Sequence, residues 1–281
     1  MRVLFFDSKN RVRTGYLLIL AMVVMISASF GAGFGSAVFI KNEVIAEIIY
    51  SILYGGITLL LAFFLFRKLY TYQKNDDMDC FQVKKESFLH LGAGLLVGLV
   101  FFTAVVIPLY LTGQYKIEFT GASFLPIFLN FVFFISVGIA EEVVTRGLMQ
   151  HALMRFGKWP AIILISVVFG LLHMANEGVT VNAILGVTFA GFMLGIAMYA
   201  TNSIMFSIGI HITWNWVQGA VYGIPVSGTV SEAHIFETTF IGSNSLVTGG
   251  EFGAEASLSC LIMLALISVV LYLYGKKKGR F

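Results

Sequence analysis

The stretch Phe131–Gly147, FVFFISVGIAEEVVTRG, decides how the rest of the chain is interpreted. An apolar run long enough to lie within a bilayer ends in Glu141 and Glu142, and Arg146 follows four residues after Glu142. A single charge at the centre of a membrane helix costs roughly 2.5–3.5 kcal/mol on insertion scales. Three charged side chains this close together therefore either pair with polar groups on neighbouring helices or take part in chemistry.

The composition around this stretch indicates a polytopic membrane protein. Of the 281 residues, 58% are hydrophobic and 12% are charged, whereas a soluble domain is about 45–50% apolar and about 25% charged. A span of the hydrocarbon core needs about 20 apolar residues, and eight segments qualify: Tyr16–Ile40, Glu43–Phe66, Leu89–Leu111, Phe124–Met149, Pro160–Asn176, Val181–Ala200, Ser203–Tyr222 and Ala256–Tyr274. We expect an all-α fold, a bundle of about eight transmembrane helices. Gly-x-x-x-Gly spacings such as Gly94/Gly98 would allow its helices to cross closely.

The basic residues predict the orientation of this bundle, because cytoplasmic loops carry an excess of Lys and Arg. One side of the predicted bundle receives Arg2, Lys9, Arg11, Arg13, Arg67, Lys68, Lys74, Lys84, Lys85, Arg155, Lys158, Lys276, Lys277, Lys278 and Arg280. The other side receives only Lys41 and Lys116. We therefore expect both termini in the cytoplasm and a multi-pass protein of the cell membrane, in a bacterial plasma membrane. Its expected partner is the lipid bilayer, and no nucleic acid is expected to bind.

Three parts of the chain can be distinguished. Residues 1–123 contain the first three apolar segments and a charged loop, residues 124–222 contain the groups that could carry chemistry, and residues 223–281 contain a loop and the last apolar segment. The loop over residues 223–252 is rich in Gly, Ser and Thr and has no Lys or Arg. We expect it to be an unstructured connector, with a lid over the bundle as the alternative.

The three charges of the opening stretch have different expected roles. Glu142 and Arg146 are four residues apart on one helical face, and we expect them to form an ion pair that positions the helix. Glu141 is rotated by about one residue from that pair and is left free to face a cavity. The alternative interpretation is that all three charges only lock helices together.

Two histidines, like the glutamates, are polar residues that lie inside apolar segments. His173 follows Phe169 by one helical turn, and His211 precedes Asn215 by one turn, so that each pair shares a face. A carboxylate and an imidazole can take a proton from water, and a second imidazole and an amide can donate to the oxyanion of a peptide under attack. The chain has neither a Gly-x-Ser-x-Gly nor a His-Glu-x-x-His motif, which argues against a serine hydrolase elbow and a zinc-protease helix.

These motifs resemble those of the CPBP intramembrane proteases, the group that contains the type II CAAX prenyl endopeptidases and the bacteriocin-processing, Abi-like proteins. EEVVTRG is similar to the Glu-Glu-x-x-x-Arg motif of that family. FGLLH, which ends at His173, and HITWN, which begins at His211, match its Phe-x-x-x-His and His-x-x-x-Asn motifs. The order and spacing of the motifs also agree, over roughly a third of the chain.

The resemblance implies an all-helical intramembrane endopeptidase that acts on a hydrophobic or lipid-modified peptide, of the CAAX-processing or bacteriocin-related kind. If this chain acts in the same way, Glu141 and His173 would activate water, and His211 and Asn215 would stabilise the oxyanion. The supporting residues that it implies are Glu142, Arg146 and Phe169.

The sequence leaves the cofactor and the class of function open. Glu141, His173 and His211 could bind Zn²⁺ in an open catalytic site, as in a metalloprotease, or could activate water without a metal. The other hypotheses are an ion-coupled transporter that uses these groups as a proton relay and a non-catalytic bacteriocin-immunity protein. No internal repeat is visible in the sequence, which counts against the transporter. Asn176 and Glu177, after His173, are expected only to meet water.

Overall fold

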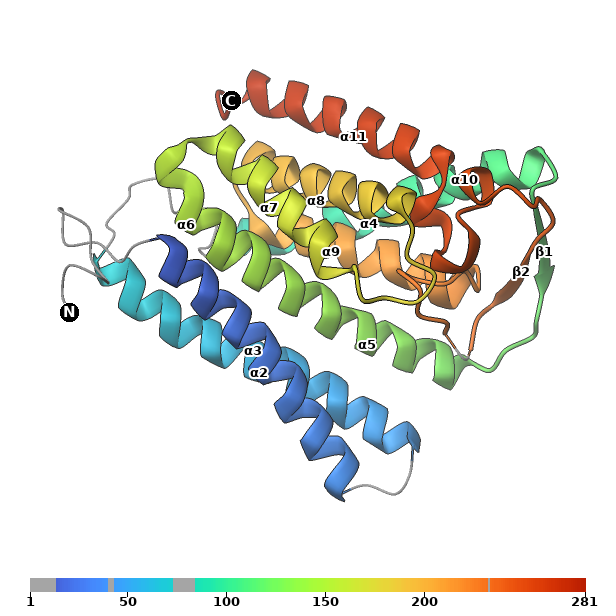
Figure 1. The fold of residues 1–281 in the computed structure, drawn as a ribbon, viewed down its shortest axis with the longest axis horizontal. Helices are drawn as coiled ribbons and strands as arrows, with labels where there is room; N and C mark the ends of the chain where they lie inside the picture. The colour runs from blue at the N-terminus through green and yellow to red at the C-terminus, as the bar shows by residue number, and fades with distance from the viewer. Residues whose placement is uncertain (1–13, 40–42, 73–83, 232) are drawn as a thin grey trace.

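The computed structural model describes residues 14–39, 43–72, 84–231 and 233–281, and over these residues the chain is mostly helical (Figure 1). The helices are α2 (Thr14–Phe39), α3 (Glu43–Tyr72), α4 (Lys85–Leu111), α5 (Phe124–Glu142), η2 (Val143–Gln150), α6 (His151–Leu153), η3 (Met154–Phe156), α7 (Lys158–Leu172), α8 (Val181–Thr201), α9 (Ile204–Trp216), η4 (Val217–Val221), α10 (Ser245–Thr248), η5 (Gly250–Phe252), η6 (Ala254–Ala256) and α11 (Leu258–Lys277). The basic residues that lie outside the described ranges are Arg2, Lys9, Arg11, Arg13, Lys41 and Lys74.

Each of the eight apolar segments forms a helix, which confirms a helical membrane protein. Within the described ranges, four helical stretches are long and apolar enough to cross a membrane: Lys85–Leu111, Phe124–Phe156, Val181–Thr201 and Leu258–Lys277. Shorter apolar stretches lie in three further helices, at Gly15–Ala28, Ile49–Phe64 and Lys158–Leu172. The count of eight spans and the cytoplasmic location of both termini stay predictions.

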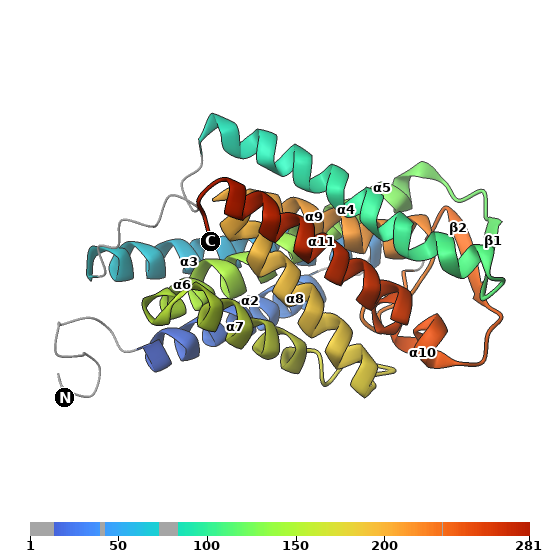
Figure 2. The same cartoon turned by 90° about the horizontal axis from the view of Figure 1, so that it is seen from above.

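Helix α9 lies at the centre of the bundle. It packs against α4, α5 and α8, while α8 is flanked in turn by α7 and α11 (Figures 1 and 2). The α2–α3 pair lies outside this group and packs along α5 and the π-helical segment η2. Nearly every α9 side chain is buried, so polar groups on this helix are removed from solvent and lipid alike.

Two short strands depart from the all-α expectation. β1 (Tyr115–Phe119) and β2 (Phe236–Phe240) pair antiparallel, with Ile117 opposite Thr238. Their sequences, YKIEF and FETTF, place apolar or β-branched residues at alternate positions, which is the pattern of a strand. Each run is only five residues long, and the strands are far apart in sequence, so neither is distinguishable from a loop by its sequence alone.

Helices α4 and α9 cross closely at a pair of glycines. A Cβ atom on Gly94 would lie 2.2 Å from the carbonyl oxygen of Phe206, and one on Gly98 would lie 2.3 Å from Oγ1 of Thr213. The interpretation of this Gly-x-x-x-Gly spacing as a helix crossing is therefore confirmed.

We expect Gly94→Ala to destabilise the protein by about 1–3 kcal/mol, because the added methyl group forces α4 away from the backbone of α9. Thermal unfolding of the purified protein in detergent measures the effect. Gly92→Ala is the matched control on the same helix, since a Cβ at Gly92 meets nothing within 4 Å. Equal midpoints for the two variants would contradict the close crossing.

Candidate active site

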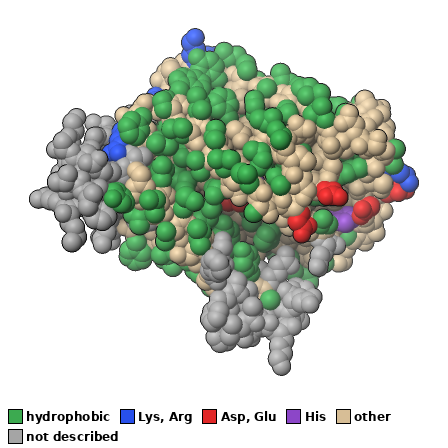
Figure 3. Space-filling model, viewed as in Figure 1, with side chains coloured by type: hydrophobic (Ala, Val, Ile, Leu, Met, Phe, Trp, Pro, Cys, Tyr) green, Lys and Arg blue, Asp and Glu red, His purple; other side chains and the backbone are tan. Residues whose placement is uncertain are grey.

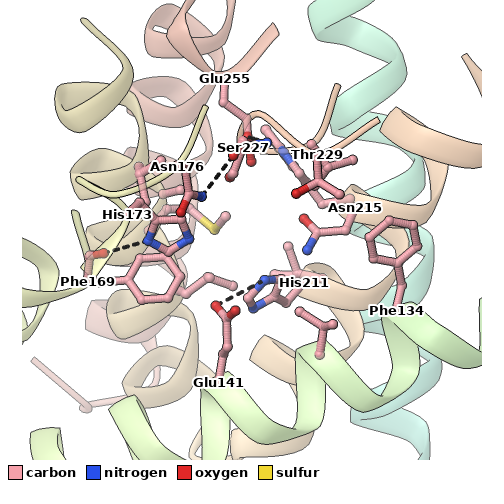
Figure 4. Close-up of a pocket in the computed structure, with 18 of the residues that line it drawn as sticks. Phe134, Glu141, Phe169, His173, Asn176, His211, Asn215, Ser227, Thr229 and Glu255 are labelled. Carbon is pink, nitrogen blue, oxygen red and sulfur yellow. Dashed lines mark hydrogen bonds and ion pairs between the residues drawn. The ribbon is translucent and has the colours of Figure 1, made fainter. Parts of the chain in front are cut away.

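A cavity of about 200 Å³ lies among α5, α7, α8 and α9, and residues after α9 close one end of it (Figure 4). Glu141, His173, His211 and Asn215, the four residues expected to carry chemistry, all line it. They come from three helices: Glu141 from the last turn of α5, His173 from the C-terminal end of α7, and His211 and Asn215 from the middle and the last turn of α9. The structure thus brings together side chains that lie up to 74 positions apart in the sequence.

Glu142 and Arg146 form the predicted ion pair. Nη1 of Arg146 lies 2.8 Å from Oε1 of Glu142, and both side chains are fully buried. Nη2 of Arg146 donates to the carbonyl oxygen of Gly191 on α8, at 3.0 Å, and its guanidinium lies 4.5 Å from the ring centre of Phe169 on α7. The pair does not line the cavity; it ties η2 to α7 and α8 behind the cavity wall.

The same carboxylate orients His211. Nδ1 of His211 lies 3.0 Å from Oε1 of Glu142, the oxygen that also accepts from Arg146. Because a carboxylate only accepts, Nδ1 carries the proton, and Nε2 is directed to the other side of the ring. That nitrogen lies 3.9 Å from Oε2 of Glu141, so the two glutamates contact opposite sides of one imidazole.

His173 is fixed by its own helix. α7 ends at Leu172, shorter than the predicted segment to Asn176, and His173 is the capping residue. Its Nδ1 lies 2.8 Å from the carbonyl oxygen of Phe169, one turn earlier. A carbonyl cannot donate, so Nδ1–H is the donor, and in the neutral ring Nε2 is left as a hydrogen-bond acceptor at the cavity.

Glu141 and Asn215 keep their polar groups available to the cavity. The Glu141 side chain is 21% exposed, while that of its neighbour Glu142 is completely buried. The hydroxyl of Thr145 donates to the backbone carbonyl of Glu141, and the carboxylate of Glu141 has His211 as its neighbour at 3.9 Å. The amide of Asn215 makes no side-chain hydrogen bond to another described residue, although Asn215 is only 7% exposed. Such an unpaired buried amide is able to bind a ligand oxygen.

The far end of the cavity is closed by residues 223–256, which we call the cap. The cap residues that line the cavity are Val226, Ser227, Thr229 and Glu255. Oε2 of Glu255 accepts from both the backbone N–H and the hydroxyl of Ser227, each at 2.7 Å. Asn176 also lines the cavity and donates to the Ser227 carbonyl at 2.8 Å. The expectation of an unstructured connector is therefore wrong, as is the expectation that Asn176 only meets water.

Little in the sequence points to these cap residues. A polar side chain in a loop rich in Gly, Ser and Thr is ordinary and does not by itself indicate burial, and Ser227 and Glu255 are 28 positions apart. The signal that the sequence does offer for the cap is glycine at positions where the backbone of the cap closely approaches another segment. A Cβ on Gly186 of α8 would lie 2.0 Å from the Glu255 carbonyl oxygen, and one on Gly253 would lie 1.8 Å from that of Pro225. Both positions need glycine for the cap to approach the bundle.

The residues considered for zinc are not arranged as a metal site. Among the described residues, no group of three or more His, Cys, Asp or Glu side chains is arranged to hold a metal ion. Glu141, His173 and His211 share the cavity, but His173 faces it from the α7 side, away from the close contact between Glu141 and His211 (Figure 4). The three side chains therefore do not fit a common zinc ion in this arrangement, which a tetrahedral site with ligands at about 2.0–2.2 Å would require.

Comparison with known families agrees with the motifs. Residues 122–217 match the family of type II CAAX prenyl endopeptidase Rce1-like proteins. No match was found among curated proteins or among solved structures. The matched residues include the glutamate pair, both histidines and Asn215, but not Ser227 or Glu255. Over residues 122–217, about a third of the chain, the protein is therefore similar to the CAAX-type intramembrane proteases, in agreement with the resemblance of its motifs to the CPBP family.

Proposed function

We propose that this protein is a multi-pass endopeptidase of the bacterial plasma membrane, which hydrolyses a peptide bond in a hydrophobic or lipid-modified peptide. The observation that carries the proposal is the convergence of Glu141, His173, His211 and Asn215 on one buried cavity. The family match supports a CAAX-type intramembrane protease in general, and CAAX-like or bacteriocin-related peptides are the substrates we propose.

In the proposed reaction, Glu141 takes a proton from a water molecule while Nε2 of His173 accepts a hydrogen bond from the same water. The water oxygen attacks the carbonyl carbon of the peptide, and the π electrons of the C=O bond move to the carbonyl oxygen. His211, as an imidazolium that donates from Nδ1 to Glu142 and from Nε2 to the cavity, and the amide of Asn215 both donate to the oxyanion that forms. Glu141 then returns the proton to the leaving amine as the C–N bond breaks.

Three surrounding residues would hold these groups in place. The Phe169 carbonyl keeps the proton of His173 on Nδ1, so that Nε2 remains the acceptor. Glu142, held by Arg146, keeps the His211 ring in its orientation. No step of this scheme passes through a metal ion, since the side chains present can supply both the base and the oxyanion donors.

Neither alternative is favoured by a particular observation. A proton-coupled transporter needs a relay that continues across the membrane, whereas the polar groups here converge on one cavity. A non-catalytic immunity protein would have no use for an amide left unpaired at Asn215.

A comparison of membrane proteomes tests the proposal and identifies the substrate. In cells that carry His173→Ala, we expect an uncleaved precursor to accumulate. The water would lose its hydrogen bond to His173 and would be held by Glu141 alone. Cells with the wild-type chain serve as the reference, and His90→Ala, a histidine near the start of α4 and outside the cavity lining, is the matched control. Identical proteomes in all three strains, with equal amounts of the protein, would refute a proteolytic role.

A further inference from the structure

The cap end of the cavity presents a carboxylate that the reaction above does not use. Glu255 is 7% exposed, and one of its oxygens, Oε2, is held by Ser227. Its other oxygen, Oε1, makes no hydrogen bond with any of the described residues. Since Glu255 lines the cavity, this oxygen is available to a group that enters it. Figure 4 shows Glu255 at the end of the cavity opposite Glu141.

The cavity wall offers Glu255 no permanent cation. Among the described residues that line the cavity, none is Lys or Arg, and the two carboxylates are those of Glu141 and Glu255. Arg146 is committed to Glu142 behind the wall. The titratable groups that act on Glu255 from the neighbouring helices are the imidazoles of His173 and His211 and the thiol of Cys260.

Because no Lys or Arg is among the described residues of the cavity wall, keeping the buried Glu255 carboxylate ionised costs free energy. Burial raises the pKa of Glu255, and the Ser227 donors and the two imidazoles offset this only in part. A buried charge is stabilised when a counter-ion with good geometry pairs with it. A cationic group brought by a ligand would supply that counter-ion, at a site where two donors already hold the carboxylate in one orientation.

The surface beside the cap has the same sign. Glu177, which follows α7, and Glu251 of the cap are both exposed there. Their backbones lie close together, since a Cβ on Gly178 would lie 2.7 Å from Cβ of Glu251 and one on Gly228 of the cap would lie 2.3 Å from the Glu177 carbonyl oxygen. Figure 3 shows acidic side chains gathered at this end of the molecule, while the Lys and Arg side chains in that view lie mainly at the other end. Such a field steers cations towards the site.

We infer that the cap end of the cavity, built around Glu255, is a subsite for a positively charged group of the peptide substrate, either a Lys or Arg side chain or an N-terminal ammonium. This inference rests on the proposed function and narrows its substrate to peptides with a cation at one position near the cleaved bond. A free carboxylate at that position would be repelled by Glu255.

The test uses the full chain in detergent and internally quenched peptides with one apolar core sequence. The peptides differ at a single position, scanned along the core, that carries Lys, norleucine or Glu. A second set has a free or an acetylated N-terminus, which separates the two sources of positive charge. At one position we expect the cationic peptide to be cleaved with a kcat/KM about tenfold or more above the norleucine peptide, as a charge-assisted hydrogen bond allows.

Glu255→Gln is the decisive variant, because it removes the charge and keeps an oxygen for Ser227. We expect it to reduce the preference to within about twofold, through a rise in KM for the cationic peptide that exceeds any change for the norleucine peptide. Glu118→Gln, at an exposed carboxylate of β1 outside the cavity lining, is the matched control and should retain the preference. Equal losses on all peptides would assign Glu255 a structural or catalytic role and overturn the subsite, as would a wild-type preference for Glu.

A binding measurement separates failure of the subsite from failure of the enzyme proposal. The uncleaved Lys and norleucine peptides are compared for the rise in thermal midpoint that each gives to the Glu141→Ala protein, with and without Glu255→Gln. If wild type cleaves none of the peptides but the Lys peptide still stabilises the protein in a Glu255-dependent way, the subsite stands and the endopeptidase proposal falls. If cleavage occurs without any charge preference in either measurement, the subsite falls and the endopeptidase stands.

Discussion

Replacement of Glu141 by glutamine is expected to abolish peptide hydrolysis while the bundle remains folded. Glutamine has nearly the same shape, but it cannot take a proton from water, and the loss of a general base lowers the rate by about 10²–10⁴-fold. The side chain is partly exposed to the cavity and makes no buried ion pair comparable to that of Glu142. The effect should therefore fall on kcat, with little change in the thermal midpoint.

The measurement is the steady-state cleavage of a substrate identified by the membrane proteome comparison. Glu118→Gln, at an exposed carboxylate of β1, controls for the general loss of a negative charge. A Glu141→Gln protein that retains more than about a tenth of wild-type kcat would show that another group activates the water. In that case the role given to Glu141 would have to be abandoned.

Replacement of Arg146 by methionine should have the largest effect on stability. Methionine fills part of the space but leaves Glu142 buried without its cation, and breaking a buried pair in this way costs about 3–5 kcal/mol. The variant also loses the hydrogen bond to Gly191 and the contact with the Phe169 ring. Unfolding of the purified protein in detergent, followed by circular dichroism, measures the change in the free energy of unfolding.

A second replacement distinguishes charge from packing. In Glu142→Gln/Arg146→Met no charge is left uncompensated, and the amide introduced at position 142 would still offer an oxygen to His211. We expect this double variant to recover at least half of the lost stability, because replacement of both partners of a buried pair is often close to neutral. A double variant no more stable than Arg146→Met would mean that the guanidinium acts mainly through its shape.

The opening stretch can be understood from sequence because its signal is local. A charge in an apolar helix is stabilised by a partner of opposite charge, and the four-residue spacing of Glu142 and Arg146 predicts that they pair with each other. The prediction that Glu141 faces a cavity follows from the same helical geometry. His173 and His211 stand out for the same reason, as polar groups among apolar neighbours, although only the structure shows that they share one cavity with Glu141.

The cap cannot be predicted in this way because its order comes from contacts between distant segments. Ser227 and Glu255 contact each other across 28 positions, and the strand that contains Thr238 pairs with one that contains Ile117. None of these residues is unusual for a loop. The C-terminal end of α7 also differs from its prediction, since the apolar run continues past the point where His173 caps the helix.

The shared oxygen of Glu142 has a consequence for how sequences with this motif can diverge. One atom accepts from both Arg146 and His211, so the group that aligns the imidazole is also one the folded state depends on. If the proposed hydrolysis were lost, stability would still select against replacing only one partner of the 142–146 pair, whereas position 141 would be released from constraint. Under the proposed function, the glutamate at 141, rather than the intact motif, would therefore distinguish an active hydrolase from an inactive relative.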